Sequence, residues 1–138
     1  DLIGGLNNEK YAVNFISKEV GADGIISTHK DTIVDGRREN LVTILKIFAY
    51  DEYSLDSAIK IVNFCKPDIV EVLPGVAIPY IIKNLRNYTN VPVNASGFLG
   101  DKVSEIIRLI KLGTSAIHTG NPRLWEIDLQ KYFNECCE

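Results

Sequence analysis

Two glycine-containing segments near the end of the sequence carry residue types that suit a phosphate group. They are residues 94–100 (NASGFLG) and 118–123 (HTGNPR), and each overlaps the end of an apolar stretch. Glycine lets a backbone approach phosphate oxygens, and N–H groups exposed in such loops donate hydrogen bonds to them. The sequence therefore predicts a phosphate site at Ser96, Gly97, Thr119, Gly120 and Asn121. In the structural alternative, the glycines serve only turns and Asn121 only caps a helix.

Asn121 and Pro122 also have the pattern of a helix start. Asparagine is a favoured N-cap and proline is favoured at the first helical position, so we expect a helix over residues 122–133. The N-terminus of that helix would direct free N–H groups toward the phosphate, and Arg123 would add a charge-assisted hydrogen bond.

Glu71 begins the string EVLPG at the end of another apolar stretch. A carboxylate there can accept hydrogen bonds from ligand hydroxyls, act as a general base, or join Asp1 or Asp51 in a metal site. An ion pair with Lys46, a cation within an otherwise apolar stretch, is the structural alternative. Lys46 equally suits an anionic ligand, so both interpretations stay open.

The other reactive side chains form no recognisable motif. His29 and His118 lie at predicted strand ends with no partner nearby in the sequence, so we expect a structural or incidental role for each. The three cysteines have no CxxC or Cys/His ligand spacing, and we expect reduced thiols and no metal site. Arg37 and Arg38 are expected on a solvated surface.

The elements that must position these residues alternate along the chain. Short apolar stretches follow amphipathic stretches of helical length, the pattern of parallel β/α units. Strands are expected at residues 23–27, 41–49, 68–73, 91–95 and 114–119. Helices are expected at residues 8–20, 31–38, 54–65, 77–88 and 101–112, with Ser54 as the cap of the third.

This rhythm is typical of either a doubly wound sheet or a (β/α)8 barrel. A dinucleotide-type doubly wound sheet would have GxGxxG after its first strand, and the sequence contains no such motif. Polar residues instead follow nearly every predicted strand, as in a barrel. We therefore expect residues 1–138 to be a single α/β domain, the last five units of a TIM-type barrel truncated at its N-terminus.

Composition narrows the cellular setting. The net charge is −3, so there is no bulk attraction to nucleic acid or to an anionic membrane. No apolar run approaches the roughly 18 residues of a membrane span, and no signal-peptide pattern is present. We expect a soluble cytoplasmic protein that does not bind membranes. Five strands alone would leave two free sheet edges, which predicts self-association into a homo-oligomer or aggregate.

Four strings occur in the order and spacing of one family: residues 1–6 (DLIGGL), 23–28 (DGIIST), 71–75 (EVLPG) and 121–125 (NPRLW). From residue 1 to about residue 126, the chain resembles the glycerol-3-phosphate responsive antiterminators, regulators of glycerol uptake operons. The resemblance implies a TIM-type barrel that senses glycerol 3-phosphate and acts on the leader mRNA of an operon to prevent early termination. It implies no catalysis and no cofactor other than this effector.

The resemblance also implies ligand-facing groups at strand ends. They correspond here to Asp1, Ser27, Thr28, Lys46, Glu71, Gly97, Thr119, Gly120 and Asn121. The alternative function is a phosphate-handling barrel enzyme, an isomerase or phosphodiesterase, that uses Glu71 with Asp1 or Asp51. A third possibility is a degenerate barrel with only a structural or interaction role.

Overall fold

A computed structural model describes residues 3–7, 9–100, 102–129 and 131 of the chain. Its centre is one parallel sheet of five strands, in which each strand pairs with the next in the sequence. The strands are β1 (Gly24–Ser27), β2 (Val42–Phe48), β3 (Ile69–Leu73), β4 (Val93–Ser96) and β5 (Ala116–His118). All five predicted strands are confirmed, and none of their ends differs by more than two residues.

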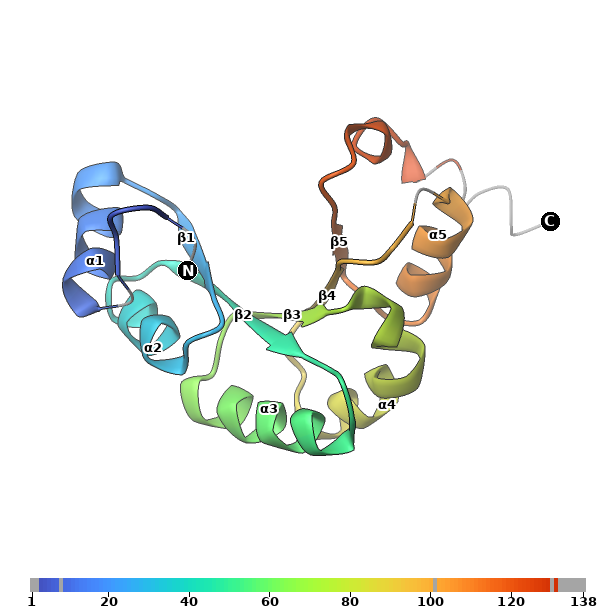
Figure 1. Ribbon diagram of the computed structural model, residues 1–138, viewed down its shortest axis with the longest axis horizontal. Helices are drawn as coiled ribbons and strands as arrows, with labels where there is room; N and C mark the ends of the chain where they lie inside the picture. Colours follow the sequence, from blue (N-terminus) through green and yellow to red (C-terminus); the bar gives the residue numbers. More distant parts are fainter. Residues whose placement is uncertain (1–2, 8, 101, 130, 132–138) are drawn as a thin grey trace.

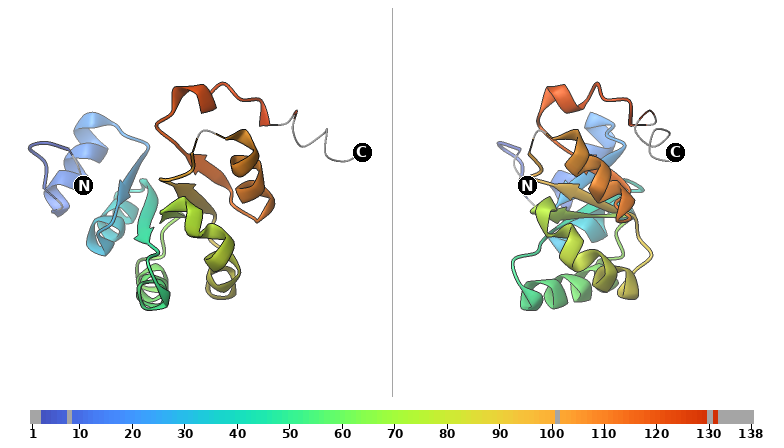
Figure 2. Two further views of the ribbon diagram at one scale, coloured as in Figure 1. Left: turned by 45° about the vertical axis from the view of Figure 1, so that its right-hand side comes forward. Right: turned by 90° about the vertical axis from the view of Figure 1, so that its right-hand side faces the viewer.

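Helices connect the strands and form a second layer. They are α1 (Lys10–Phe15), which continues into the π-helix η1 (Ile16–Val20), α2 (Lys30–Arg38), α3 (Glu52–Cys65), η2 (Gly75–Ala77), α4 (Ile78–Tyr88), α5 (Val103–Lys111) and η3 (Pro122–Leu124). The strands form the inner layer of an open arc and the helices its outer layer (Figure 1). Figure 2 shows the same layers from two further directions. None of the described helices has the length and hydrophobicity needed to span a bilayer.

The strand order separates the two architectures that the sequence rhythm allowed. A doubly wound sheet reverses its strand order and carries helices on both faces, whereas this sheet runs in sequence order with its helices on one face. The alternating β/α units are therefore confirmed and the doubly wound alternative is wrong. In the described part of the chain the five units form an arc whose edges are β1 and β5.

The core lies between the sheet and the helices. Alternate side chains of β2, Leu45 and Ile47, are buried against the helical layer, while Lys46 lies between them on the opposite, inner face of the sheet. From the helices, Ile78, Leu85 and Leu109 are fully buried in the same core. The outer face of β2 is thus buried under the helices, and its inner face carries Lys46 together with the apolar residues Val42, Ile44 and Phe48.

One predicted helix start and one predicted helix length need correction. Helix α3 is capped by Asp51 and not by Ser54, because the Asp51 side chain accepts a hydrogen bond from the Ser54 N–H at 2.7 Å, and the Ser54 hydroxyl accepts one from the Asp51 N–H. The helix expected over residues 122–133 is instead the three-residue 3₁₀ helix η3, followed by a turn at residues 125–126. Residues 130, 132 and 133 lie outside the described part.

Arg37 has a structural role that its exposure conceals. Its guanidinium donates hydrogen bonds to the carbonyl oxygens of Cys65 and Lys66, where α3 ends with Lys66 in the left-handed conformation. The last carbonyls of a helix have no hydrogen-bond partner within that helix. Arg37, which lies on α2, donates to two such carbonyls at the end of α3. Arg37 is exposed, as expected, but it also makes these structural hydrogen bonds. Arg38 instead forms an exposed ion pair with Asp35 at 2.9 Å.

Replacing Arg37 by alanine should lower the free energy of unfolding by about 1 kcal/mol, because two helix-terminal carbonyls lose a charged donor. The matched control is Arg38→Ala, which removes an exposed ion pair and should cost at most about 0.5 kcal/mol. Urea denaturation of both variants measures the difference. Equal losses would show that the Arg37 hydrogen bonds contribute nothing beyond surface charge.

Candidate functional site

Glu71 is the centre of a polar cluster on the inner face of the sheet. Its side chain is only 1% exposed. Oε1 accepts a hydrogen bond from the Ser96 hydroxyl at 2.9 Å and lies 3.2 Å from Nζ of Lys46. Oε2 lies 2.9 Å from Nδ1 of His118. We call Lys46, Glu71, Ser96 and His118 the Glu71 cluster.

Strand register explains why these four residues meet. Lys46 is the register partner of Glu71 across β2 and β3, and Ser96 is the register partner of His118 across β4 and β5. Register partners in parallel strands project to the same face, so all four side chains lie on the inner face. The ion pair of Lys46 with Glu71, one of two interpretations left open by the sequence, is confirmed.

The environment keeps the Glu71 carboxylate charged. Burial opposes ionisation and is the strongest single influence, raising the pKa of Glu71. Hydrogen bonds from His118, Ser96 and Lys46, together with the positive charge of Lys46, outweigh burial and leave the pKa below its ordinary value. A buried anion therefore holds one cation and one histidine at the centre of the sheet.

His118 is the member of the cluster that sequence reasoning missed. It lies 47 residues after Glu71, and only the strand register brings the two side chains together. The signal available in the sequence was that both lie near the ends of predicted strands. His29, in contrast, is exposed at the end of β1, and its backbone N–H donates to the Ser27 hydroxyl at 3.0 Å.

The loop after β4 has the left-handed backbone expected of a glycine-rich turn. Gly97 has φ +72° and Gly100 has φ +64°, and Phe98 between them also has a positive φ of 53°. The Gly97 carbonyl accepts a hydrogen bond from the Gly75 N–H at 3.0 Å, which ties this loop to the one after β3. Ser96 is buried, and its hydroxyl donates to Glu71. This serine thus links the predicted phosphate loop to the Glu71 cluster.

The loop after β5 follows directly from His118. The Thr119 hydroxyl accepts a hydrogen bond from the Asn121 N–H at 3.1 Å, and the Asn121 side chain accepts one from the Arg123 N–H at 3.1 Å. The N-cap role of Asn121 is confirmed, but a three-residue helix lacks the dipole expected from a longer one. Gly120 is exposed, and a Cβ added there would have no atom within 4 Å.

The remaining predicted positions lie apart from the cluster. Ser27 is 1% exposed and is the register partner of Leu45, so its side chain faces the helical layer and not the inner face. Thr28 follows it and is partly exposed. Asp51 is exposed and caps α3, where hydrogen bonds from the Ser54 backbone and side chain lower its pKa. Asp1 lies outside the described residues.

Metal chemistry gains no support from the geometry. Within the described ranges, no group of three or more histidine, cysteine, aspartate or glutamate side chains is arranged to hold a metal ion. Asp51 caps a helix, while the Glu71 carboxylate is bound by Ser96, Lys46 and His118. Glu71 and Asp51 therefore do not form a shared metal site in this structure.

Comparison with known proteins identifies the family. The family model described as glycerol-3-phosphate responsive antiterminator matches residues 1–125. The chain belongs to this family. The matched residues include the Glu71 cluster and the two glycine-containing loops.

Solved structures agree with this antiterminator assignment. The glycerol uptake operon antiterminator regulatory protein of Listeria monocytogenes is 32% identical, with a TM-score of 0.85 over 91% of this chain and 67% of its own. A glycerol uptake operon antiterminator-related protein of Thermotoga maritima is 30% identical, with a TM-score of 0.80 over 91% and 69% of the two chains.

A curated relative, Uncharacterized protein YgcP of Escherichia coli, is 29% identical over 127 residues, or 92% of this chain. The antiterminator-family chain spans 65% of the length of that relative.

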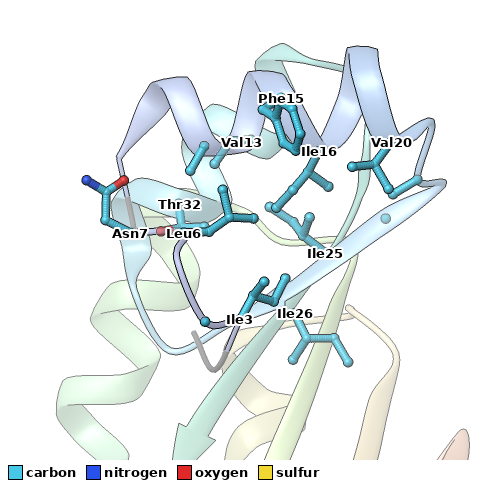
Figure 3. A pocket seen from close by; sticks show the side chains of 14 residues that line it. Ile3, Leu6, Asn7, Val13, Phe15, Ile16, Val20, Ile25, Ile26 and Thr32 are labelled. Carbon is cyan, nitrogen blue, oxygen red and sulfur yellow. The ribbon is translucent and has the colours of Figure 1, made fainter.

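A cavity of about 590 Å³ lies away from the Glu71 cluster in this antiterminator-family chain. It is enclosed by α1, η1, β1 and the segment before α1, and its lining is mostly apolar (Figure 3). Thr32 contributes a buried hydroxyl with no hydrogen-bond partner among the described residues. None of the described residues predicted to bind the effector lines this cavity.

Proposed function

We propose that this protein senses glycerol 3-phosphate and, with the effector bound, acts on the leader mRNA of a glycerol uptake operon to prevent early termination. Family membership supports the effector class and the regulatory role. The observation that carries the proposal is the Glu71 cluster, which lies beside two glycine-containing loops at the same edge of the sheet. The role requires no catalysis and no cofactor, and it places the protein in the cytoplasm with the transcript.

In the proposed complex, the phosphate of the effector binds to the backbone of the loops that contain Gly97 and Gly120. Both loops follow adjacent strands, β4 and β5, and Gly120 leaves open space for an anion. Lys46 supplies a cation on the inner face, where its side chain is 27% exposed. Thr119 and Asn121 complete the phosphate side of the proposed site.

The glycerol end of the effector is assigned to the carboxylate of Glu71. A carboxylate has about four acceptor positions, and three are used by Ser96, Lys46 and His118, so one remains for a ligand hydroxyl. Asp1 and Thr28 stay in the proposed site on the family resemblance. Ser27, which faces the helical layer, is given a structural role.

We further propose that the arc is part of a (β/α)8 barrel in the complete protein. Sequential parallel strands with helices on one face are the arrangement of such barrels. The alignments with the two solved relatives cover 67% and 69% of those chains. The enzyme alternative loses support because Asp51 caps α3 and the Glu71 carboxylate is almost completely buried.

Isothermal titration calorimetry of the complete protein tests the effector. Glycerol 3-phosphate should bind with a dissociation constant in the micromolar range, and glycerol or inorganic phosphate should bind far more weakly because each offers half of the contacts. Heat with none of the three compounds would overturn the sensor proposal.

A charge placed at Gly120 tests the predicted phosphate loop. Gly120→Asp should weaken glycerol 3-phosphate binding by about tenfold or more, because a carboxylate would face the phosphate dianion. Gly120→Asn, nearly identical in size but neutral, is the matched control and should weaken binding much less. Both variants should retain the stability of the parent chain, since an added Cβ meets no atom within 4 Å. Equal binding by the two variants would remove the phosphate from this loop.

A further inference from the structure

We propose that His118 takes up a proton when the protein binds its anionic effector, so that effector affinity falls as the pH rises above neutrality. The inference rests on the proposed function, because it assumes a phosphate ligand next to β5. It adds a residue that the predicted site did not contain. It also makes the regulator sensitive to pH as well as to its effector.

The first step is the tautomer of the His118 ring. Nδ1 lies 2.9 Å from Oε2 of Glu71, and an ionised carboxylate can only accept hydrogen bonds. The hydrogen of a neutral His118 must therefore be on Nδ1. Nε2 then carries a lone pair and can only accept.

The second step is where Nε2 lies. The Glu71 carboxylate is 1% exposed and the His118 side chain is 54% exposed, so the ring buries its Nδ1 edge and presents the rest. His118 directly precedes Thr119 and Gly120, the residues of the proposed phosphate loop. A lone pair on Nε2 would repel phosphate oxygens, whereas a proton there makes Nε2 a charged donor to them.

The third step is the charge balance around the ring. Glu71 is the ionisable group in contact with His118, and Lys46 lies on the other carboxylate oxygen. β4 carries no ionisable residue, and on the opposite face α5 carries Glu105, Arg108 and Lys111. Arg123 is the cation of the loop that follows β5. Lys46 and Glu71 offset each other, so protonation of His118 supplies the positive charge that a phosphate dianion favours.

Calorimetry in two buffers of different ionisation enthalpy measures the protons taken up. At pH 8, glycerol 3-phosphate is almost entirely a dianion, and we expect uptake of about one-half to one proton for each ligand bound. At alkaline pH, affinity should fall by up to about tenfold for each pH unit. His118→Asn keeps an N–H donor for Glu71 but has no second nitrogen, so proton uptake should disappear. His29→Asn, at an exposed histidine outside the cluster, should behave as the parent chain.

Each outcome has a distinct meaning. Binding without proton uptake, or equal uptake by the parent and His118→Asn, would overturn the role of His118 and leave the sensor proposal intact. No binding of glycerol 3-phosphate by the parent chain would overturn both. If His118→Asn fails to fold, nitrogen NMR of the parent ring decides: Nε2 should change from an unprotonated to a protonated signal on ligand addition. An unchanged signal would overturn the inference.

Discussion

Replacing Glu71 by glutamine should lower the free energy of unfolding at pH 7 by about 2–3 kcal/mol. Removing one partner of a buried ion pair costs about 3–5 kcal/mol when the remaining charge stays buried, and here Lys46 and His118 keep partial contact with water. Glutamine retains the volume and one acceptor oxygen, so the loss reports charge and hydrogen bonding and not a cavity. Urea denaturation at pH 7 measures it. Glu105→Gln, which breaks the exposed pair with Arg108, is the control and should cost at most about 0.5 kcal/mol.

The same variant should change the pH dependence of stability. The pKa of Glu71 in the folded chain is lowered, so the carboxylate contributes stability above its unfolded-state pKa. That contribution is lost as the pH falls through the lower, folded-state pKa, where the carboxylate becomes protonated. The difference in stability between parent and Glu71→Gln should therefore shrink in acid. A difference that stays constant from neutral to strongly acidic pH would show that the charge of Glu71 is not its source.

Alanine at Gly97 should cost about 2–3 kcal/mol of folding free energy, more than alanine at any other glycine of the two predicted phosphate loops. At φ +72° an alanine is strained by about 1–2 kcal/mol. Its Cβ would also meet Cδ1 of Leu73 at 2.3 Å, so that side chain must change rotamer, for about 1 kcal/mol more. Backbone strain and the contact with Leu73 therefore act together at this position.

Two further glycines separate these contributions. Gly100 has φ +64° but no atom within 4 Å of an added Cβ, so Gly100→Ala should cost about 1 kcal/mol from strain alone. Gly120 has neither a positive φ nor a close neighbour, so Gly120→Ala should be neutral to about 0.5 kcal/mol. Urea denaturation of the three variants should rank them in this order. A loss at Gly97 no greater than that at Gly100 would show that Leu73 yields without cost.

Much of the fold could be predicted from the sequence because its strands are short apolar stretches separated by amphipathic ones. Residues such as Leu45, Val70 and Val93 are buried against the helical layer. A strand covered by helices needs such apolar residues in any α/β fold, so the apolar pattern identifies the strands before the strand order is known. The ends of helices were less predictable. Asp51 and Ser54 are both residue types that favour the N-cap position. In the structure Asp51 is the N-cap, and it exchanges hydrogen bonds with Ser54 in a capping box.

The site was predictable only in part, because it depends on strand register. Glu71 and Lys46 were candidates because each is a charged residue in a predicted apolar strand. The sequence left open whether Lys46 pairs with Glu71 or binds an anionic ligand. The contact between Glu71 and His118 joins strands that are not adjacent, and a shift of one residue in β5 would turn His118 to the other face. Ser27 shows the reverse case: a hydroxyl at a strand end faces the helical layer because it is in register with Leu45.

The sequential strand order also determines when the Glu71 cluster can form during synthesis. Lys46, Glu71, Ser96 and His118 leave the ribosome in that order, and each new strand pairs with the one made just before it. When Glu71 emerges, Lys46 has already been synthesised, whereas Ser96 and His118 have not. A nascent chain therefore lacks the complete cluster until β4 and β5 have joined the sheet. The proposed effector site would therefore be incomplete in any nascent chain that has not yet reached β5.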